Sequence, residues 1–74
     1  MPGVTLENVD AVFTYHSPDS DQEAAYKAVR EDAKLLAETI LNVAPVCADQ
    51  QAALRKLREA VMTANAAIAL KGAI

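Results

Sequence analysis

Apolar residues recur at helical spacing through the first half of the chain. They fall mostly at three- and four-residue intervals, at Tyr26, Val29, Ala33, Leu36, Ala37, Ile40, Val43 and Ala44. This spacing places them on one face of an amphipathic helix. Asp19 and Gln22 stand at the positions of a capping box, and Pro45 disfavours a helical residue before it. The pattern predicts a helix over residues 19–44.

A second helical pattern follows after a short turn. Its apolar stripe consists of Leu54, Leu57, Val61, Ala64 and Ile68. Gly72 is suited to stop the helix at its C-terminal end. The pattern predicts a helix over residues 47–70. A connection of about four residues makes the two helices antiparallel neighbours, each roughly 36 Å long at 1.5 Å per residue.

Residues 1–18 form a lead-in segment without a core pattern of its own. Thr5–Ala11 is compatible with a turn of helix, although its capping signal is weak. Phe13–His16 reads as an extended aromatic segment, which Ser17 and Pro18 end. The predicted fold is therefore all-α: one domain over residues 1–74, an antiparallel helical hairpin with a short N-terminal lead-in.

The uncharged stretch Val61–Leu70 is apolar or small on almost every face. A helix that is apolar all round is normally buried on all sides, and a 74-residue chain cannot supply that cover alone. A single cysteine and a single histidine exclude an internal disulfide and argue against structural zinc. A homo-oligomer is favoured over a well-packed monomeric hairpin. Asn65 is expected to hydrogen-bond across a subunit contact and set its register.

The net charge of −3 argues against DNA or RNA polymers as ligands, but leaves open a small anion in a local basic pocket. The N-terminal segment has neither the basic region nor the apolar run of a signal peptide. The apolar C-terminal stretch is too short to span a bilayer. We expect a cytoplasmic protein without membrane contact. The chain has no recognisable catalytic triad, metal-ligand spacing or phosphate-binding glycine loop, so we expect a binding protein without cofactor or metal, and not an enzyme.

Arg30 is the main candidate for a phosphate contact. Lys27, Arg30 and Lys34 share one helix face, and Arg30 borders the apolar stripe. Its planar guanidinium suits a phosphate at a protein–protein seam. The alternative is a solvated face with Lys27–Glu31 and Lys34–Glu38 ion pairs. That alternative is favoured for both lysines, and both interpretations stay open for Arg30.

Tyr15 and His16 precede the first helix on the lead-in segment. An aromatic ring there can stack on a nucleobase, worth about 1–3 kcal/mol per base. The alternative is a hydrophobic anchor that clamps the lead-in onto the hairpin, which is favoured for Phe13 and stays open for Tyr15. A second basic cluster, expected to be a solvated face, consists of Arg55, Lys56 and Arg58.

Two motifs resemble a known family. The first is Phe13-Thr14-Tyr15-His16-x-Pro18, and the second is Glu59-Ala60-Val61-Met62-x-Ala64-Asn65-Ala66-Ala67-Ile68-Ala69, with Gln22, Tyr26, Val29, Arg30, Pro45, Leu54 and Leu57 between them. They are similar to the phage anti-CBASS cyclic-oligonucleotide sponges, whose hairpin domain also occurs in phage anti-Thoeris sponges.

The resemblance implies a homohexamer that binds cyclic dinucleotides without cleaving them. In some members cyclic trinucleotides occupy a separate site. Sequestering the messenger in the cytoplasm of the infected bacterial host blocks CBASS antiphage signalling. The resemblance also implies that Tyr15 stacks on a base and that Arg30 meets phosphate. His16, Lys34 and Lys71 are the further ligand-binding candidates.

The sequence departs from the family pattern at four positions. Thr63 replaces a tryptophan, Ser17 a proline, and Cys47 a polar helix cap, at a cost of about 1 kcal/mol. Leu70 stands where a basic residue is usual, and Lys71 points about 100° further round a helix. The absence of a basic residue at position 70 argues against a trinucleotide site more than against a dinucleotide site. The competing hypothesis is an oligomeric helical module that binds a host or phage protein through its apolar final stretch.

Overall fold

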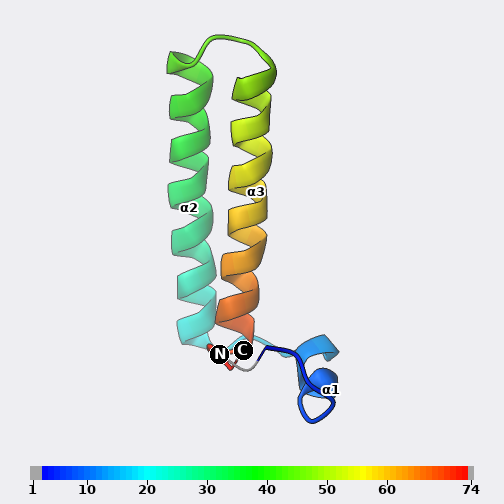
Figure 1. Cartoon of the computed structure of the whole chain (residues 1–74). Helices are drawn as coiled ribbons and strands as arrows, with labels where there is room; N and C mark the ends of the chain where they lie inside the picture. Colours follow the sequence, from blue (N-terminus) through cyan, green and yellow to red (C-terminus); the bar gives the residue numbers. More distant parts are fainter. Residues whose placement is uncertain (1–2, 74) are drawn as a thin grey trace.

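The structure, a computed structural model, describes residues 3–73. It contains α1 (Val9–Phe13), α2 (Ser20–Val43) and α3 (Ala48–Ala69). Helices α2 and α3 run antiparallel and pack together as a hairpin, while α1 stands beside its open end (Figure 1). Because the described residues form helices and no strand, the prediction of an all-helical chain is confirmed for them.

The start of α2 is fixed by a capping box, as predicted. The Asp19 carboxylate accepts a hydrogen bond from the Gln22 backbone N–H at 2.8 Å, and the Gln22 side-chain oxygen accepts one from the Asp19 N–H at 2.9 Å. The helix ends at Val43 because Ala44, before Pro45, adopts an extended conformation with ψ of 137°.

The loop between the helices ends at Cys47, the N-cap residue of α3. Its side chain makes no capping hydrogen bond, in agreement with the expectation for a thiol at this position. Gln50 in the first turn of α3 is buried, and its side-chain amide donates to the Ala44 carbonyl at 3.1 Å. The side-chain hydrogen bond that ties the loop to α3 therefore comes from Gln50 in the first helical turn and not from the N-cap residue Cys47.

The C-terminal end of α3 differs from the sequence prediction. The Gly72 N–H donates to the Ala67 carbonyl at 3.0 Å and the Lys71 N–H donates to the Ile68 carbonyl at 3.2 Å. This pair of bonds is a Schellman motif. Lys71, with φ of +52°, occupies the left-handed position where glycine is usual, one residue before Gly72, and α3 ends at Ala69 with Leu70 as its C-cap. Lys71 consequently does not continue the helical surface.

The lead-in also differs from its prediction. The sequence suggested a helical turn over Thr5–Ala11 and an extended segment from Phe13, but the helix covers Val9–Phe13. The side chain of Asn8 explains the shift, because it accepts from the Thr5 N–H at 2.7 Å and donates to the Gly3 carbonyl at 2.9 Å. An asparagine bonded to nearby backbone in this way competes with helix formation.

The hairpin covers its apolar stripes only in part, because most of their members are half-buried. Among residues 3–73 no apolar side chain is buried, and the two buried residues are Gln22 and Gln50. Leu41 is 52% exposed and Met62 is 61% exposed. Two helices cover each other on one side only, so apolar side chains outside their contact, such as Leu41 and Met62, face outward. In the part of the chain that the structure describes, no helix is long and apolar enough to cross a membrane.

Candidate functional site

The lead-in and α3 enclose a groove that contains Tyr15, which we call the aromatic groove. It has a volume of about 480 Å³ and is lined by Tyr15, His16, Tyr26, Met62, Asn65 and Leu70, among others. The Tyr15 side chain is 82% exposed. A ring that is held at a groove and free on most of its surface can stack on a flat ligand.

His16 ties the end of the lead-in back to α1 beside this groove. Its Nε2 lies 2.6 Å from the Ala11 carbonyl oxygen. Because a carbonyl only accepts, Nε2 carries the proton and donates it. The Thr14 hydroxyl donates to the Asp10 carbonyl in the same region. These two bonds tie residues on both sides of Tyr15 back to α1 and constrain the backbone that carries its ring.

A second groove, the end groove, lies next to the first at the open end of the hairpin. It has a volume of about 340 Å³ and is lined by His16, Ser17, Asp19, Gln22, Leu70 and Lys71, among others. His16 and Leu70 line both grooves, so the two are continuous.

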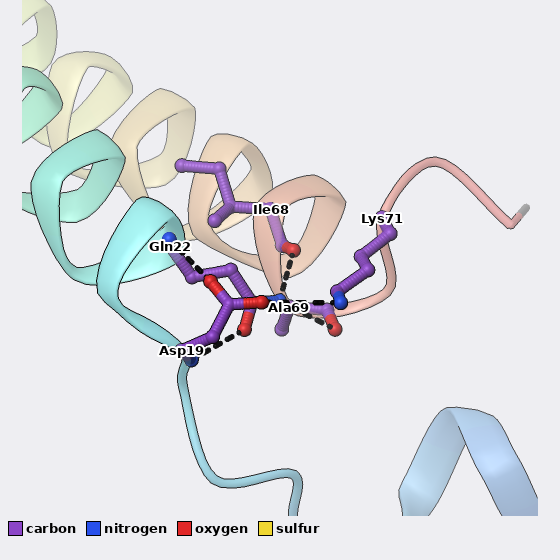
Figure 2. Close-up of polar contacts among 5 residues, drawn as sticks. All are labelled: Asp19, Gln22, Ile68, Ala69 and Lys71. Carbon is purple, nitrogen blue, oxygen red and sulfur yellow. Dashed lines mark hydrogen bonds and ion pairs between the residues drawn. The ribbon is translucent and has the colours of Figure 1, made fainter.

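The charge of Lys71 in the end groove is already paired. Its Nζ lies 3.2 Å from the Asp19 carboxylate (Figure 2). The Gln22 backbone N–H, and after it the Lys71 ammonium, lowers the pKa of Asp19 below its ordinary value. An anion that binds at Lys71 therefore has to displace or share the Asp19 carboxylate.

A third groove, the arginine groove, runs between the middle parts of α2 and α3. It has a volume of about 560 Å³ and is lined by Arg30, Lys34, Leu41, Leu54, Arg58 and Val61, among others. Arg30 and Lys34 are exposed residues of α2. Arg58 comes from α3 and adds a third cation, although the sequence placed it on a solvated face. Its spacing of four residues from Leu54 was the signal that it borders the apolar stripe.

Tyr15 and Arg30 line different grooves of one chain. The aromatic and arginine grooves both include Met62, so they meet at that residue of α3. Lys27 forms the expected ion pair with Glu31 at 3.9 Å, with both side chains mostly exposed. Among residues 3–73, ion pairs join Lys27 to Glu31 and Lys71 to Asp19, and none joins Lys34 to Glu38. The Lys34 charge therefore remains available at the arginine groove.

A family model described as Acb2/Tad1, hairpin domain, matches residues 5–69. The chain belongs to this family. It is the family of anti-CBASS and anti-Thoeris sponges that the two sequence motifs resemble. The match spans α1, α2 and α3, and it includes Tyr15 and Arg30. No curated protein and no solved structure matches the chain.

The chemistry available in this Acb2/Tad1 hairpin is that of binding. The grooves offer an aromatic ring, cations and apolar walls. Within the described residues, no three His, Cys, Asp or Glu side chains gather in a way that could hold a metal ion. The Acb2/Tad1 hairpin is a binding domain of sponge proteins.

Proposed function

We propose that this Acb2/Tad1 hairpin binds cyclic dinucleotide second messengers and holds them without cleaving them. It would thereby block CBASS antiphage signalling in the cytoplasm of the infected bacterial host. The observation that carries the proposal is the family match over residues 5–69, which contains an exposed Tyr15 ring and an exposed Arg30. In the proposal, Tyr15 stacks on a base and Arg30 contacts phosphate.

The arginine groove suits a compact ligand with two phosphates. Arg30, Lys34 and Arg58 give it positive charge although the whole chain carries −3. Its walls are otherwise largely leucine, valine and alanine side chains. In the proposal, a second copy that covers this groove would strengthen each phosphate contact because it would lower the local dielectric constant.

We further propose that a second copy of the chain completes the site. Tyr15 and Arg30 line different grooves of one chain, and in the proposal a neighbouring copy brings its own aromatic or basic side chains to the same ligand. Self-association is supported by exposed apolar side chains such as Leu41 and Met62, and by the absence of a buried apolar residue among residues 3–73. The homohexamer implied by the family resemblance is the assembly that we propose.

Cyclic trinucleotides are expected to bind more weakly than cyclic dinucleotides. A second ligand at the end groove would meet Lys71 and His16. Lys71 is held by Asp19, and the neighbouring Leu70 carries no charge. The Asp19–Lys71 ion pair would have to open first.

The test is a titration of the purified protein with a panel of cyclic di- and trinucleotides. It is followed by heat denaturation and chromatography of the released ligand. The expected result is tight binding of one or more cyclic dinucleotides and their recovery intact. Linear or mononucleotide products in proportion to protein would show an enzyme instead. Light scattering of the same sample should give a hexamer, whereas a monomer without ligand binding would favour the interaction module.

A further inference from the structure

The side-chain oxygen of Asn65 is buried without a hydrogen-bond partner. Among the described residues it is the one buried side-chain polar atom in this state. Buried acceptors in proteins almost always have a donor, so an exception calls for an explanation. The other buried or half-buried side-chain amides have partners: Gln22 donates to the Ile68 carbonyl, Gln50 to the Ala44 carbonyl and Asn8 to the Gly3 carbonyl.

This unsatisfied group lies at the aromatic groove. Asn65 is half-buried and lines the groove together with Tyr15, Tyr26 and Met62. The groove volume of about 480 Å³ falls within the range of small-molecule sites. Thr63, two residues earlier on α3, donates to the Glu59 carbonyl at 2.9 Å and is not among the lining residues. The residue that carries the unpaired oxygen thus lines the groove, and a turn of its terminal torsion would bring this oxygen to a bound ligand.

We propose that Asn65 recognises the hydrogen-bonding edge of the base that stacks on Tyr15. A carboxamide offers an acceptor and a donor side by side, and asparagine pairs with adenine through two such bonds. The Watson–Crick edge of every nucleobase places a donor next to an acceptor, and the terminal torsion of asparagine turns easily enough to match either order. The inference rests on the proposed function and adds to it a residue that contacts the base.

The alternative partner for Asn65 is a donor from a second copy of the chain. Both possibilities satisfy the same oxygen, but they predict different effects when the amide is removed. If Asn65 contacts the ligand, the free protein lacks this contact. Removing the amide then weakens ligand binding, and it relieves the free protein of a buried unsatisfied group. A subunit contact is present in the free assembly, so its loss weakens the assembly itself.

The experiment compares wild type with Asn65→Leu, which is close to isosteric and apolar. Each protein is titrated calorimetrically with cyclic di-AMP and with cyclic di-GMP, and each is sized and melted without ligand. We expect Asn65→Leu to keep the wild-type oligomer and to melt a few degrees higher. It should bind the wild-type ligand about 10- to 100-fold more weakly. The matched control is Thr63→Val, which also removes a polar group from α3 and should bind as wild type does.

Two results would overturn the inference. The first is an Asn65→Leu protein that dissociates or melts at a lower temperature, which would assign the residue to a subunit contact. The second is wild-type affinity in Asn65→Leu alongside weakened binding in Tyr15→Ala, which would leave the proposed function intact and remove Asn65 from the site. A wild-type protein that binds neither cyclic di-AMP, cyclic di-GMP nor any other cyclic dinucleotide would overturn the proposed function as well.

Discussion

The side-chain amide of Gln22, in the first turn of α2, donates to the carbonyl of Ile68 near the end of α3 at 2.9 Å. It also approaches the Ala69 carbonyl at 3.5 Å, while its oxygen caps the start of α2 (Figure 2). One buried side chain therefore satisfies an N–H at the beginning of one helix and a carbonyl at the end of the other. This contact links the two helices at the open end of the hairpin, beside the end groove.

Replacing Gln22 by methionine should destabilise the hairpin. The change keeps the length of the side chain but leaves the Asp19 N–H and the Ile68 carbonyl without their partner. We expect a loss of about 1–3 kcal/mol, measured by denaturant unfolding. Gln51→Met, at an exposed position of α3, is the control: it loses one hydrogen bond to the Gln50 side-chain oxygen and should cost less than Gln22→Met. Equal stability of the two variants would show that the Gln22 contacts contribute little.

The Asp19 carboxylate should make the folding stability of the hairpin depend on pH in the acid range. The Gln22 backbone N–H and the Lys71 ammonium hold the pKa of Asp19 below its ordinary value of 3.8. A group with a lowered folded-state pKa contributes stability above its unfolded-state pKa and loses it as the pH falls through the folded-state pKa. The melting temperature of wild type should therefore fall below about pH 4 more steeply than that of Asp19→Asn. Asp32→Asn, on the exposed side of α2, should retain the wild-type slope, and parallel curves for all three proteins would contradict the prediction.

A charge in the alanine-rich part of α3 should disrupt the assembly. Ala64 is half-buried and Ala67 is exposed in the single chain, so a second copy could cover either. Ala64→Glu and Ala67→Glu would each place an unpaired carboxylate there, which costs several kcal/mol when buried. Light scattering at micromolar concentration should show a smaller species for at least one variant. Unchanged mass for both would mean that this surface is not a subunit contact.

Tyr15 and Arg30 should each be needed for ligand binding. Tyr15→Ala removes a stacking surface worth about 1–3 kcal/mol per base, and Arg30→Ala removes a charged contact worth about 1.5–3 kcal/mol. Calorimetry should show binding of cyclic dinucleotides weakened about tenfold or more in each variant. Both variants should keep the wild-type mass. Lys27→Ala, which removes a cation paired with Glu31 on the same helix, should bind normally. Wild-type affinity in both variants would place the ligand elsewhere.

Sequence alone predicted the parts of the fold that depend on local signals. The capping box of Asp19 and Gln22 and the stop before Pro45 are both present, because each depends on residues a few positions apart. The all-helical class followed from the apolar spacing. The family followed from two motifs, and its match covers residues 5–69.

Features that depend on contacts between distant residues were not predictable from spacing. The helical pattern gave no reason for Lys71 to adopt φ of +52°. In the structure this conformation occurs together with the Schellman hydrogen bonds and with the ion pair of Lys71 to Asp19, which is distant in sequence. The shift of the lead-in helix to Val9–Phe13 depends on how the Asn8 side chain binds the backbone. The separation of Tyr15 and Arg30 into different grooves depends on where the lead-in lies beside α3.

The loop between α2 and α3 carries Cys47, an exposed thiol and the one cysteine of the chain. It lies at the end of the hairpin opposite α1, in a molecule 47 Å long (Figure 1). A single attachment point of this kind allows fluorescent donor and acceptor dyes to be placed on separate batches of protein that are then mixed. Strong energy transfer between the dyes would mean that neighbouring hairpins point the same way. Weak transfer in a mixed assembly of unchanged mass would mean that they alternate.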